Sequence, residues 1–270
     1  MSIDLDAYFA RIGYAGPRTP DVQTLDAITR AHTSTIPFEN LDVLLGKRWS
    51  LEPEVLFRKL VTERRGGYCF EQNGLLLEVL TQLGFHVRPL SARVRIDRPR
   101  EYIPSRTHAF LRVELPEGPR ITDVGVGALS LTSSLRLDSS DEQSTPHEPR
   151  RIVREEGKFF HQVKLGDVWS DVYEFTGEEM PLIDREIGHW YTSAHPTSHF
   201  RNRLIVACAG PDGTRLTLLN DELKRRARDG KAEVQKIGSP SELLAVMREH
   251  FGLVFPADTR FGPAGTVWPS

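Results

Sequence analysis

A cysteine that lies just after two glycines and opens a helical pattern is the feature that most constrains this chain. Gly66 and Gly67 permit a tight turn and a close approach to the backbone, and Cys69 follows within two residues. The apolar side chains beyond it recur at helical spacing, at Leu76, Val79, Leu80 and Leu83. Gly84 is placed to end this helix. The pattern therefore predicts a helix whose first turn contains Cys69.

The first turn of a helix is a favourable place for a reactive cysteine. Its backbone N–H groups have no partners within the helix, and the positive end of the helix dipole stabilises a thiolate over a thiol. A nucleophile needs this low pKa, together with exposure and an adjacent N–H group that stabilises an oxyanion. A free cysteine is also commonly a small buried hydrophobic residue. On this stretch alone, both interpretations of Cys69 stay open.

The spacing of apolar residues divides the chain into parts of different fold. The first 84 residues show helical spacing, whereas the middle of the chain shows the alternation typical of strands. Strands are predicted at residues 87–96, 107–115, 120–124, 158–165 and 168–175. They indicate an antiparallel sheet or a small barrel. The last third is mixed, with a hairpin of residues 204–209 and 214–219 before a helix at 243–250, so the predicted fold class is α+β.

Capping and turn residues predict several local boundaries. Thr19 is expected to cap a helix that begins at Pro20, and residues 36–42 are expected to form a structured loop. Residues 138–149 are polar and acidic, which predicts an exposed loop. The basic residues of 224–228 come directly before an Asp-Gly pair, which favours a solvated hairpin turn over a nucleic-acid patch.

Composition narrows the class of protein. The chain has 270 residues, 39% of them hydrophobic, and a net charge of −2, so no overall field points to nucleic acid or a membrane. Its two cysteines, Cys69 and Cys208, fit a reducing compartment better than a disulfide framework. The acidic N-terminus has no apolar core of a signal peptide, and no apolar run is as long as a membrane span. These features predict a soluble cytoplasmic protein.

A cysteine nucleophile needs a base, and the base needs an orienting group. Of the nine histidines, His108 lies on a predicted strand between small and apolar neighbours. A short turn follows, and the next predicted strand carries Asp123. Hairpin pairing is expected to bring Asp123 beside His108, with the glycine-rich residues 125–127 just beyond. The alternative is a buried histidine satisfied by hydrogen bonds and an ordinary aspartate at the end of a strand.

Together, these motifs resemble those of the arylamine N-acetyltransferases. The resemblance is carried by residues 65–73 (RGGYCFEQN), 107–111 (THAFL), 122–127 (TDVGVG), 36–42 (IPFENLD) and 190–200 (WYTSAHPTSHF). It implies three domains: a helical bundle at 1–84 with the cysteine, a β-barrel at 85–190 with the histidine and aspartate, and an α/β lid at 191–270. It also implies a catalytic triad of Cys69, His108 and Asp123.

The resemblance further implies a ping-pong mechanism. The Cys69 thiolate takes an acetyl group from acetyl-CoA, and the nitrogen of an aromatic amine or hydrazine then attacks the thioester. The family's substrate-binding positions correspond to residues of five short segments: Phe38, Tyr68, Val94, Thr107, Gly125, Val126, Gly127 and Phe200. Aromatic faces suit an arylamine, and the two loop glycines allow close approach of CoA. For Val94 and the glycines, core packing and a tight turn are equally open interpretations.

Three alternatives remain at this stage. The first is an amide synthase of the same family that uses a carrier-bound acyl chain, the second a cysteine hydrolase, and the third a binding protein that keeps the fold. No metal is expected: Pro196 interrupts the spacing of His189, His195 and His199, and no carboxylate is placed to complete a site. Cys208 is expected to be inert. The sequence gives neither the physiological acceptor nor the oligomeric state.

Overall fold

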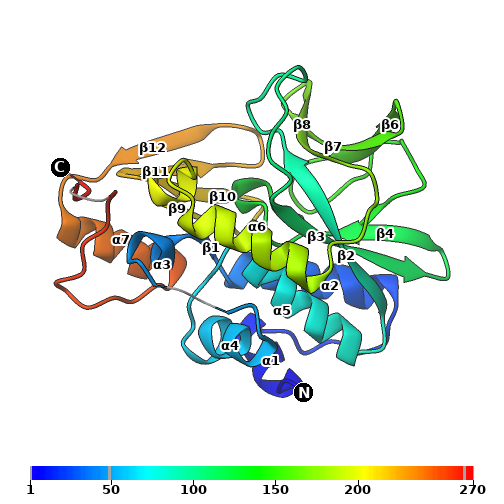
Figure 1. Ribbon diagram of the computed structural model, residues 1–270, viewed down its shortest axis with the longest axis horizontal. Coiled ribbons are helices and arrows are strands. Elements are labelled where there is room, and N and C mark those ends of the chain that lie inside the picture. The colour runs from blue at the N-terminus through cyan, green and yellow to red at the C-terminus, as the bar shows by residue number, and fades with distance from the viewer. Residues whose placement is uncertain (1, 48–49, 264–265, 270) are drawn as a thin grey trace.

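The structure is a computed structural model that describes residues 2–47, 50–263 and 266–269. It confirms the α+β class: helices occupy the N-terminal part, a seven-stranded sheet the middle, and a second sheet with a helix the C-terminal part (Figure 1). None of the helices within these ranges combines the length and hydropathy that a membrane-spanning segment needs. The two boundaries of the three expected domains, at residues 84 and 190, stay a prediction.

Six helical elements of the described residues precede the first long strand: α1 (Leu5–Ile12), α2 (Val22–Thr35), α3 (Leu41–Leu44), α4 (Pro53–Phe57), the π-helix η1 (Arg58–Thr62) and α5 (Cys69–Gln82). A 3-10 turn, η2 (Gly127–Leu129), comes later, after the fourth strand. The Asp4 carboxylate caps α1 by accepting from the Ala7 N–H at 3.0 Å, and Gly13 ends it at φ +66°. Gly84, at φ +86°, follows α5 as the spacing predicts.

Two predictions in this part are wrong in detail. The cap of α2 is Asp21, whose carboxylate accepts from the Thr24 N–H at 2.8 Å, and not Thr19. The carboxylate is placed directly before the first helical residue, whereas Thr19 hydrogen-bonds Asp21 itself. The loop expected at residues 36–42 contains a short strand, β1 (Phe38–Glu39), which pairs with a strand far along the chain.

The middle sheet is antiparallel and curls into a nearly closed barrel. Its strands are β2 (His86–Val94), β3 (His108–Leu115), β4 (Gly118–Thr122), β5 (Leu135–Arg136), β6 (Arg150–Glu155), β7 (Lys158–Leu165) and β8 (Val168–Phe175). Their spatial order is β5-β4-β3-β2-β8-β7-β6. The β3–β4 hairpin pairs Leu111 with Thr122, so residue 123 emerges where β3 begins. The predicted hairpin is therefore confirmed.

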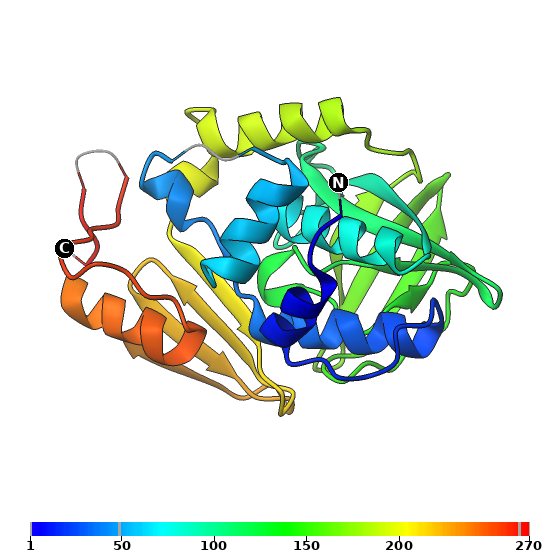
Figure 2. The ribbon, with the colours of Figure 1, turned by 90° about the horizontal axis from the view of Figure 1, so that it is seen from below.

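The C-terminal part is a five-stranded antiparallel sheet covered by a helix. It comprises β9 (Ile205–Ala209), β10 (Arg215–Leu219), β11 (Glu222–Arg226), β12 (Ala232–Lys236) and α7 (Pro240–Phe251), with β1 at the free edge of β9. Figure 2 shows this sheet and α7 at one end, the green barrel strands at the other, and the blue and cyan helices between them. A hairpin turn at residues 227–231 joins β11 to β12, as predicted from the Asp-Gly pair, although residues 224–226 of the basic stretch belong to β11.

One further helix, α6 (Leu182–Ala194), and a 3-10 turn, η3 (His199–Arg201), connect the barrel to the second sheet. Each part has its own apolar core, and a fourth buried cluster lies where they meet. That cluster contains Cys69, Phe38, Tyr68, Ala109 and Ala207. Residues of all three parts of the fold therefore surround Cys69.

A buried carboxylate ties the barrel to the C-terminal sheet. Glu148, 7% exposed, accepts from Arg150 at 3.0 Å and from Arg215 at 2.8 Å, and it also pairs with Arg226. The three cations lower the pKa of Glu148 even though burial opposes this. The group lies within the polar loop at 138–149 that was expected to be exposed, so that prediction is wrong for Glu148.

We expect Glu148→Gln to lower the free energy of unfolding by about 3–5 kcal/mol, because it leaves the buried guanidinium groups of Arg150 and Arg215 without a counter-charge. Urea unfolding followed by circular dichroism measures the change. Asp212→Asn is the matched control, since it breaks an exposed ion pair with Arg225 on the same sheet and should cost less than about 1 kcal/mol. Equal losses in the two variants would contradict the prediction.

Candidate active site

The nucleophile candidate is the first residue of α5. Tyr68 is the N-cap, with extended backbone, and its N–H donates to the Glu71 carboxylate at 3.1 Å. This bond is half of a capping box, and it fixes where the helix starts. Cys69 thus has a backbone N–H that no carbonyl of its own helix can accept. The sequence prediction for this helix is confirmed.

Both glycines of the preceding turn are required by close contacts. A Cβ on Gly66 would lie 2.0 Å from the Pro37 carbonyl oxygen, and one on Gly67 would lie 2.7 Å from the Glu71 carboxylate. These distances are below any normal contact between non-bonded atoms. The turn is therefore pressed against its surroundings, and glycine is needed for space at both positions.

Five buried charged side chains lie beneath this turn. Lys59 contacts Glu71 at 2.5 Å and Asp42 at 3.0 Å, while Arg65 contacts Glu39 at 2.6 Å and Asp42 at 3.1 Å. We refer to these five residues as the ion cluster. All are less than 10% exposed. Sequence reasoning missed the ion cluster, although four of its members lie in or beside quoted motifs.

The structure brings Cys69, His108 and Asp123 together, as the hairpin argument predicts. His108 Nε2 lies 2.7 Å from Asp123 Oδ2, and all three side chains are buried. Cys69 lies close enough to His108 to help raise the pKa of the imidazole, while Nε2 of the ring faces the carboxylate. The Cys69 Sγ lies 3.8 Å from the Thr107 carbonyl oxygen.

The electrostatics of the site favour a charged imidazole. Burial lowers the pKa of His108, but the Asp123 carboxylate, its hydrogen bond and the neighbouring Cys69 outweigh burial and raise that pKa to about 10. An imidazolium beside a thiol at the start of a helix stabilises the thiolate. The arrangement therefore places a charged imidazole beside Cys69 at neutral pH.

Asn73 connects the nucleophile helix α5 to β3 and to the segment that begins at Asp123. Sequence reasoning assigned it no role. Its amide nitrogen donates to the Ala109 carbonyl at 2.8 Å and to Asp123 Oδ1 at 2.9 Å. Its amide oxygen accepts from the Val124 N–H at 3.1 Å. Since Asn73 is one turn along α5 from Cys69, it fixes the distance from the nucleophile helix to Asp123.

The glycine loop after Asp123 packs directly on the nucleophile. A Cβ on Gly125 would lie 2.6 Å from Cys69 Cα. Glycine is therefore required at this position because the loop packs closely on α5. Gly127 adopts φ +80°, in the region that favours glycine, and lies against the Phe38 ring. Between them, Val126 belongs to the barrel core.

Three aromatic side chains form one wall beside Cys69. The Phe38 and Phe200 rings are 6.1 Å apart, and those of Tyr68 and Phe200 are 5.4 Å apart. Thr107 directly precedes β3, and its carbonyl oxygen lies 3.8 Å from Cys69 Sγ. Its contact with substrate stays a prediction. Val94, by contrast, does not belong to this wall: it pairs with Tyr173 of β8 and packs against the barrel core.

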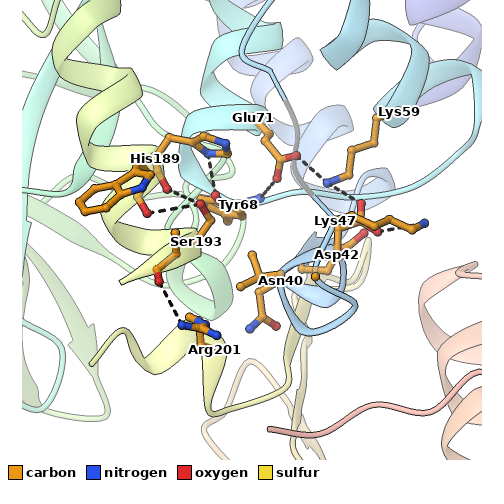
Figure 3. A pocket seen from close by; sticks show the side chains of 14 residues that line it. Asn40, Asp42, Lys47, Lys59, Tyr68, Glu71, His189, Ser193 and Arg201 are labelled. Carbon is orange, nitrogen blue, oxygen red and sulfur yellow. Dashed lines mark hydrogen bonds and ion pairs between the residues drawn. The ribbon is translucent and has the colours of Figure 1, made fainter. Parts of the chain in front are cut away.

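Two cavities lie beside α6. One, of about 340 Å³, is lined by Thr107, Met180 and Tyr191 among others. The other, of about 420 Å³, is lined by Tyr68, Glu71, His189 and Trp190 among others (Figure 3). Neither contains the Cys69, His108 or Asp123 side chain in its lining. Each cavity, however, has one predicted substrate residue in its wall, Thr107 or Tyr68.

The remaining histidine and cysteine candidates have separate surroundings. His189 hydrogen-bonds the Tyr68 hydroxyl at 2.6 Å, and His195 hydrogen-bonds Thr197 at 2.9 Å. In the part of the chain that the structure describes, no group of three or more His, Cys, Asp or Glu side chains is arranged to hold a metal ion. Burial raises the pKa of Cys208 to about 11, which is consistent with an inert thiol.

Comparison with known proteins gives the same assignment throughout. The family model described as N-acetyltransferase matches residues 21–260. The arylamine N-acetyltransferase of Mycolicibacterium smegmatis is 43% identical over 257 residues, covering 94% of this chain and 93% of that protein. The Escherichia coli K12 arylamine N-acetyltransferase is 41% identical over 253 residues, covering 94% and 90%.

Solved structures agree with the sequences. The structure of Mycobacterium marinum arylamine N-acetyltransferase in complex with CoA matches with a TM-score of 0.88 and 38% identity, over 92% of each chain. Both the sequence and the fold are thus similar, over most of their length, to those of arylamine N-acetyltransferases. The chain belongs to the arylamine N-acetyltransferase family and is an acyltransferase.

Proposed function

We propose that this enzyme transfers the acetyl group of acetyl-CoA to aromatic amines and hydrazines through an acetyl-Cys69 thioester. The observation that carries the proposal is the buried triad: Cys69 at the start of α5, His108 with a pKa that the neighbouring Cys69 helps to raise, and Asp123 Oδ2 at 2.7 Å from His108 Nε2. Family membership supports the reaction class, and the CoA complex of the Mycobacterium marinum relative supports the donor.

In the first half-reaction, the Cys69 thiolate attacks the carbonyl carbon of acetyl-CoA. The new carbon–sulfur bond forms as the bond to the CoA sulfur breaks, and the CoA thiolate takes the proton of the His108 imidazolium. The N–H of Cys69, at the positive end of α5, is a donor for the oxyanion that develops on the carbonyl oxygen. This half-reaction leaves acetyl-Cys69 and a neutral His108.

In the second half-reaction, the acceptor nitrogen attacks the thioester. His108 accepts the nitrogen's proton, the Cys69 thiolate leaves, and the thiolate–imidazolium pair is restored. Asp123 holds the imidazole orientation and stabilises its charged form through both steps. Exchange between two thioesters is nearly isoenergetic, so acetyl-Cys69 is not a deep trap.

The acceptor is placed against the aromatic wall of Phe38, Phe200 and Tyr68, because aromatic rings stack or meet edge to face at these separations. The glycine loop is the proposed contact for the CoA chain. Gly127 supports this role through its backbone freedom, and Val126 and Val94 contribute through the barrel core next to it.

No metal takes part in the proposed mechanism. Both thiols are free, which supports a cytoplasmic location.

Intact-protein mass spectrometry with acetyl-CoA alone tests the proposal. We expect a gain of one acetyl group in the native protein, no gain in Cys69→Ala, and discharge of the acetyl group when aniline is added. Cys69→Ser should keep no more than a few per cent of turnover, because a serine hydroxyl is a far weaker acid than a thiol and forms the attacking anion much less readily. Loss of acetyl without added amine, at a comparable rate, would indicate a hydrolase instead.

The pKa of His108 predicts a pH dependence of stability. The folded protein binds this proton more tightly than the unfolded chain, where the pKa is 6.5, so the stabilisation is complete below pH 6.5 and is lost as the pH rises towards 10. Asp123→Asn removes the main charge that raises the pKa. We therefore expect the stability gap between native protein and variant to narrow by a few kcal/mol between pH 6.5 and 10.

Urea unfolding at both pH values measures this gap. The same pair of proteins is also compared in a Cys69→Ala background, where titration of the thiol cannot contribute. A gap that stays constant, or widens with pH, would show that Asp123 does not raise the pKa of His108.

A further inference from the structure

Ser130 directly follows the 3-10 turn η2 and is hydrogen-bonded to the glycine loop of residues 125–127. Its hydroxyl accepts from the Val126 N–H at 3.1 Å, and its own N–H donates to the Gly127 carbonyl at 3.0 Å. Ser130 is 1% exposed, so these bonds are shielded from water. The backbone of two consecutive loop residues is therefore fixed by its contacts with Ser130.

Arg215, on strand β10 of the C-terminal sheet, holds Ser130 in turn. Its Nη1 donates to the Ser130 carbonyl at 2.9 Å, while its Nε and Nη2 donate to the two carboxylate oxygens of Glu148 at 3.2 and 2.8 Å. A guanidinium is planar and its N–H groups point in fixed directions. The two bonds to Glu148 therefore set the direction in which Nη1 reaches Ser130.

The start of the same segment is attached to the nucleophile helix instead. Asn73 of α5 donates to Asp123 at 2.9 Å and accepts from the Val124 N–H at 3.1 Å. The segment thus has two separate attachments: its start is joined to α5, and its end, through Ser130, to the C-terminal sheet. A change at Arg215 is therefore expected to displace the end of the loop and to leave the triad in place.

We propose that Arg215 is a positioning residue for the acyl donor, which acts through Ser130 to hold the glycine loop where the chain of CoA passes Cys69. This inference rests on the proposed function, in which the glycine loop contacts CoA. The Val126 side chain packs in the barrel core and Gly127 has none, so the loop offers its backbone to a ligand. The position of that backbone is what the contact from Arg215 determines.

The test compares two acyl donors that both deliver acetyl to Cys69. Acetyl-CoA has the long chain that the glycine loop is proposed to contact, whereas p-nitrophenyl acetate has neither pantetheine nor nucleotide. We expect Arg215→Met and Ser130→Ala each to lower kcat/KM for acetyl-CoA about tenfold, through the loss of one buried hydrogen bond that fixes the loop. The rate of p-nitrophenolate release from p-nitrophenyl acetate should stay at the native value.

The acceptor gives a second readout from the same variants. In a ping-pong mechanism, kcat/KM for aniline reports only the second half-reaction, after CoA has left. It should therefore stay at the native value in both variants. Ser130→Ala keeps Arg215 and Glu148 in place, so it tests the proposal even if Arg215→Met does not fold.

Arg226→Met is the matched control for Arg215→Met. Arg226 pairs with the same Glu148 carboxylate from the neighbouring strand β11, so this variant also removes one cation from the buried group. Its kcat/KM for acetyl-CoA should equal that of the native protein. An equal loss in Arg226→Met would overturn the proposal, because the effect would then come from the charges around Glu148 and not from the contact with Ser130.

The remaining outcomes separate this proposal from the one on which it rests. If the native protein loads acetyl from acetyl-CoA and the variants lose both donors equally, the contacts act on the triad and the proposal is wrong. Unchanged kcat/KM for acetyl-CoA in the folded variants would contradict it as well. If the native protein never forms acetyl-Cys69 from acetyl-CoA, the proposed function itself fails.

Discussion

The ion cluster beneath the turn before Cys69 is the constraint on which the rest of the site depends. Lys59, presented by the π-helix η1, and Arg65, within the turn, share the carboxylates of Glu39, Asp42 and Glu71. Burying five charges is costly, and such clusters add little net stability. Their effect here is positional. Glu71 caps α5 through the Tyr68 N–H, so the same carboxylate that neutralises Lys59 also sets where the helix begins.

The triad follows from that fixed starting point. Cys69 comes from α5, His108 from β3 and Asp123 from the end of β4. The helical part and the barrel must therefore stay in a fixed position relative to each other. Asn73 provides it, since one amide group contacts the Ala109 carbonyl, Asp123 and the Val124 N–H. Gly125 then allows the loop to approach Cys69 Cα without a side chain between them. Cys69 and Asn73 are neighbours on α5, so the contacts of Asn73 also fix the position of Cys69 relative to the hairpin that carries His108.

Local signals explain why part of this site was predictable from the sequence. The Cys69 helix depends on residues a few positions apart, and His108 and Asp123 are only 15 residues apart on one hairpin. The ion cluster depends on contacts such as Arg65 with Glu39, which no local pattern encodes. Helix α6 was missed for another reason: its buried positions are Gly188 and Thr192, whereas Ile187 and Trp190 are exposed. This reverses the usual apolar stripe.

The triad and the aromatic wall beside it are held by different parts of the chain. Cys69, His108 and Asp123 belong to α5 and the barrel hairpin, which are joined by Asn73. The wall comes from Phe38 at the edge of the second sheet, Phe200 beyond α6, and Tyr68, whose hydroxyl hydrogen-bonds His189 of α6. The contact from α6 therefore reaches the aromatic wall without involving the imidazole or its carboxylate. Tyr68 directly precedes Cys69, so two different contacts act on it. Glu71 fixes its backbone at the start of α5, and His189 contacts its side chain.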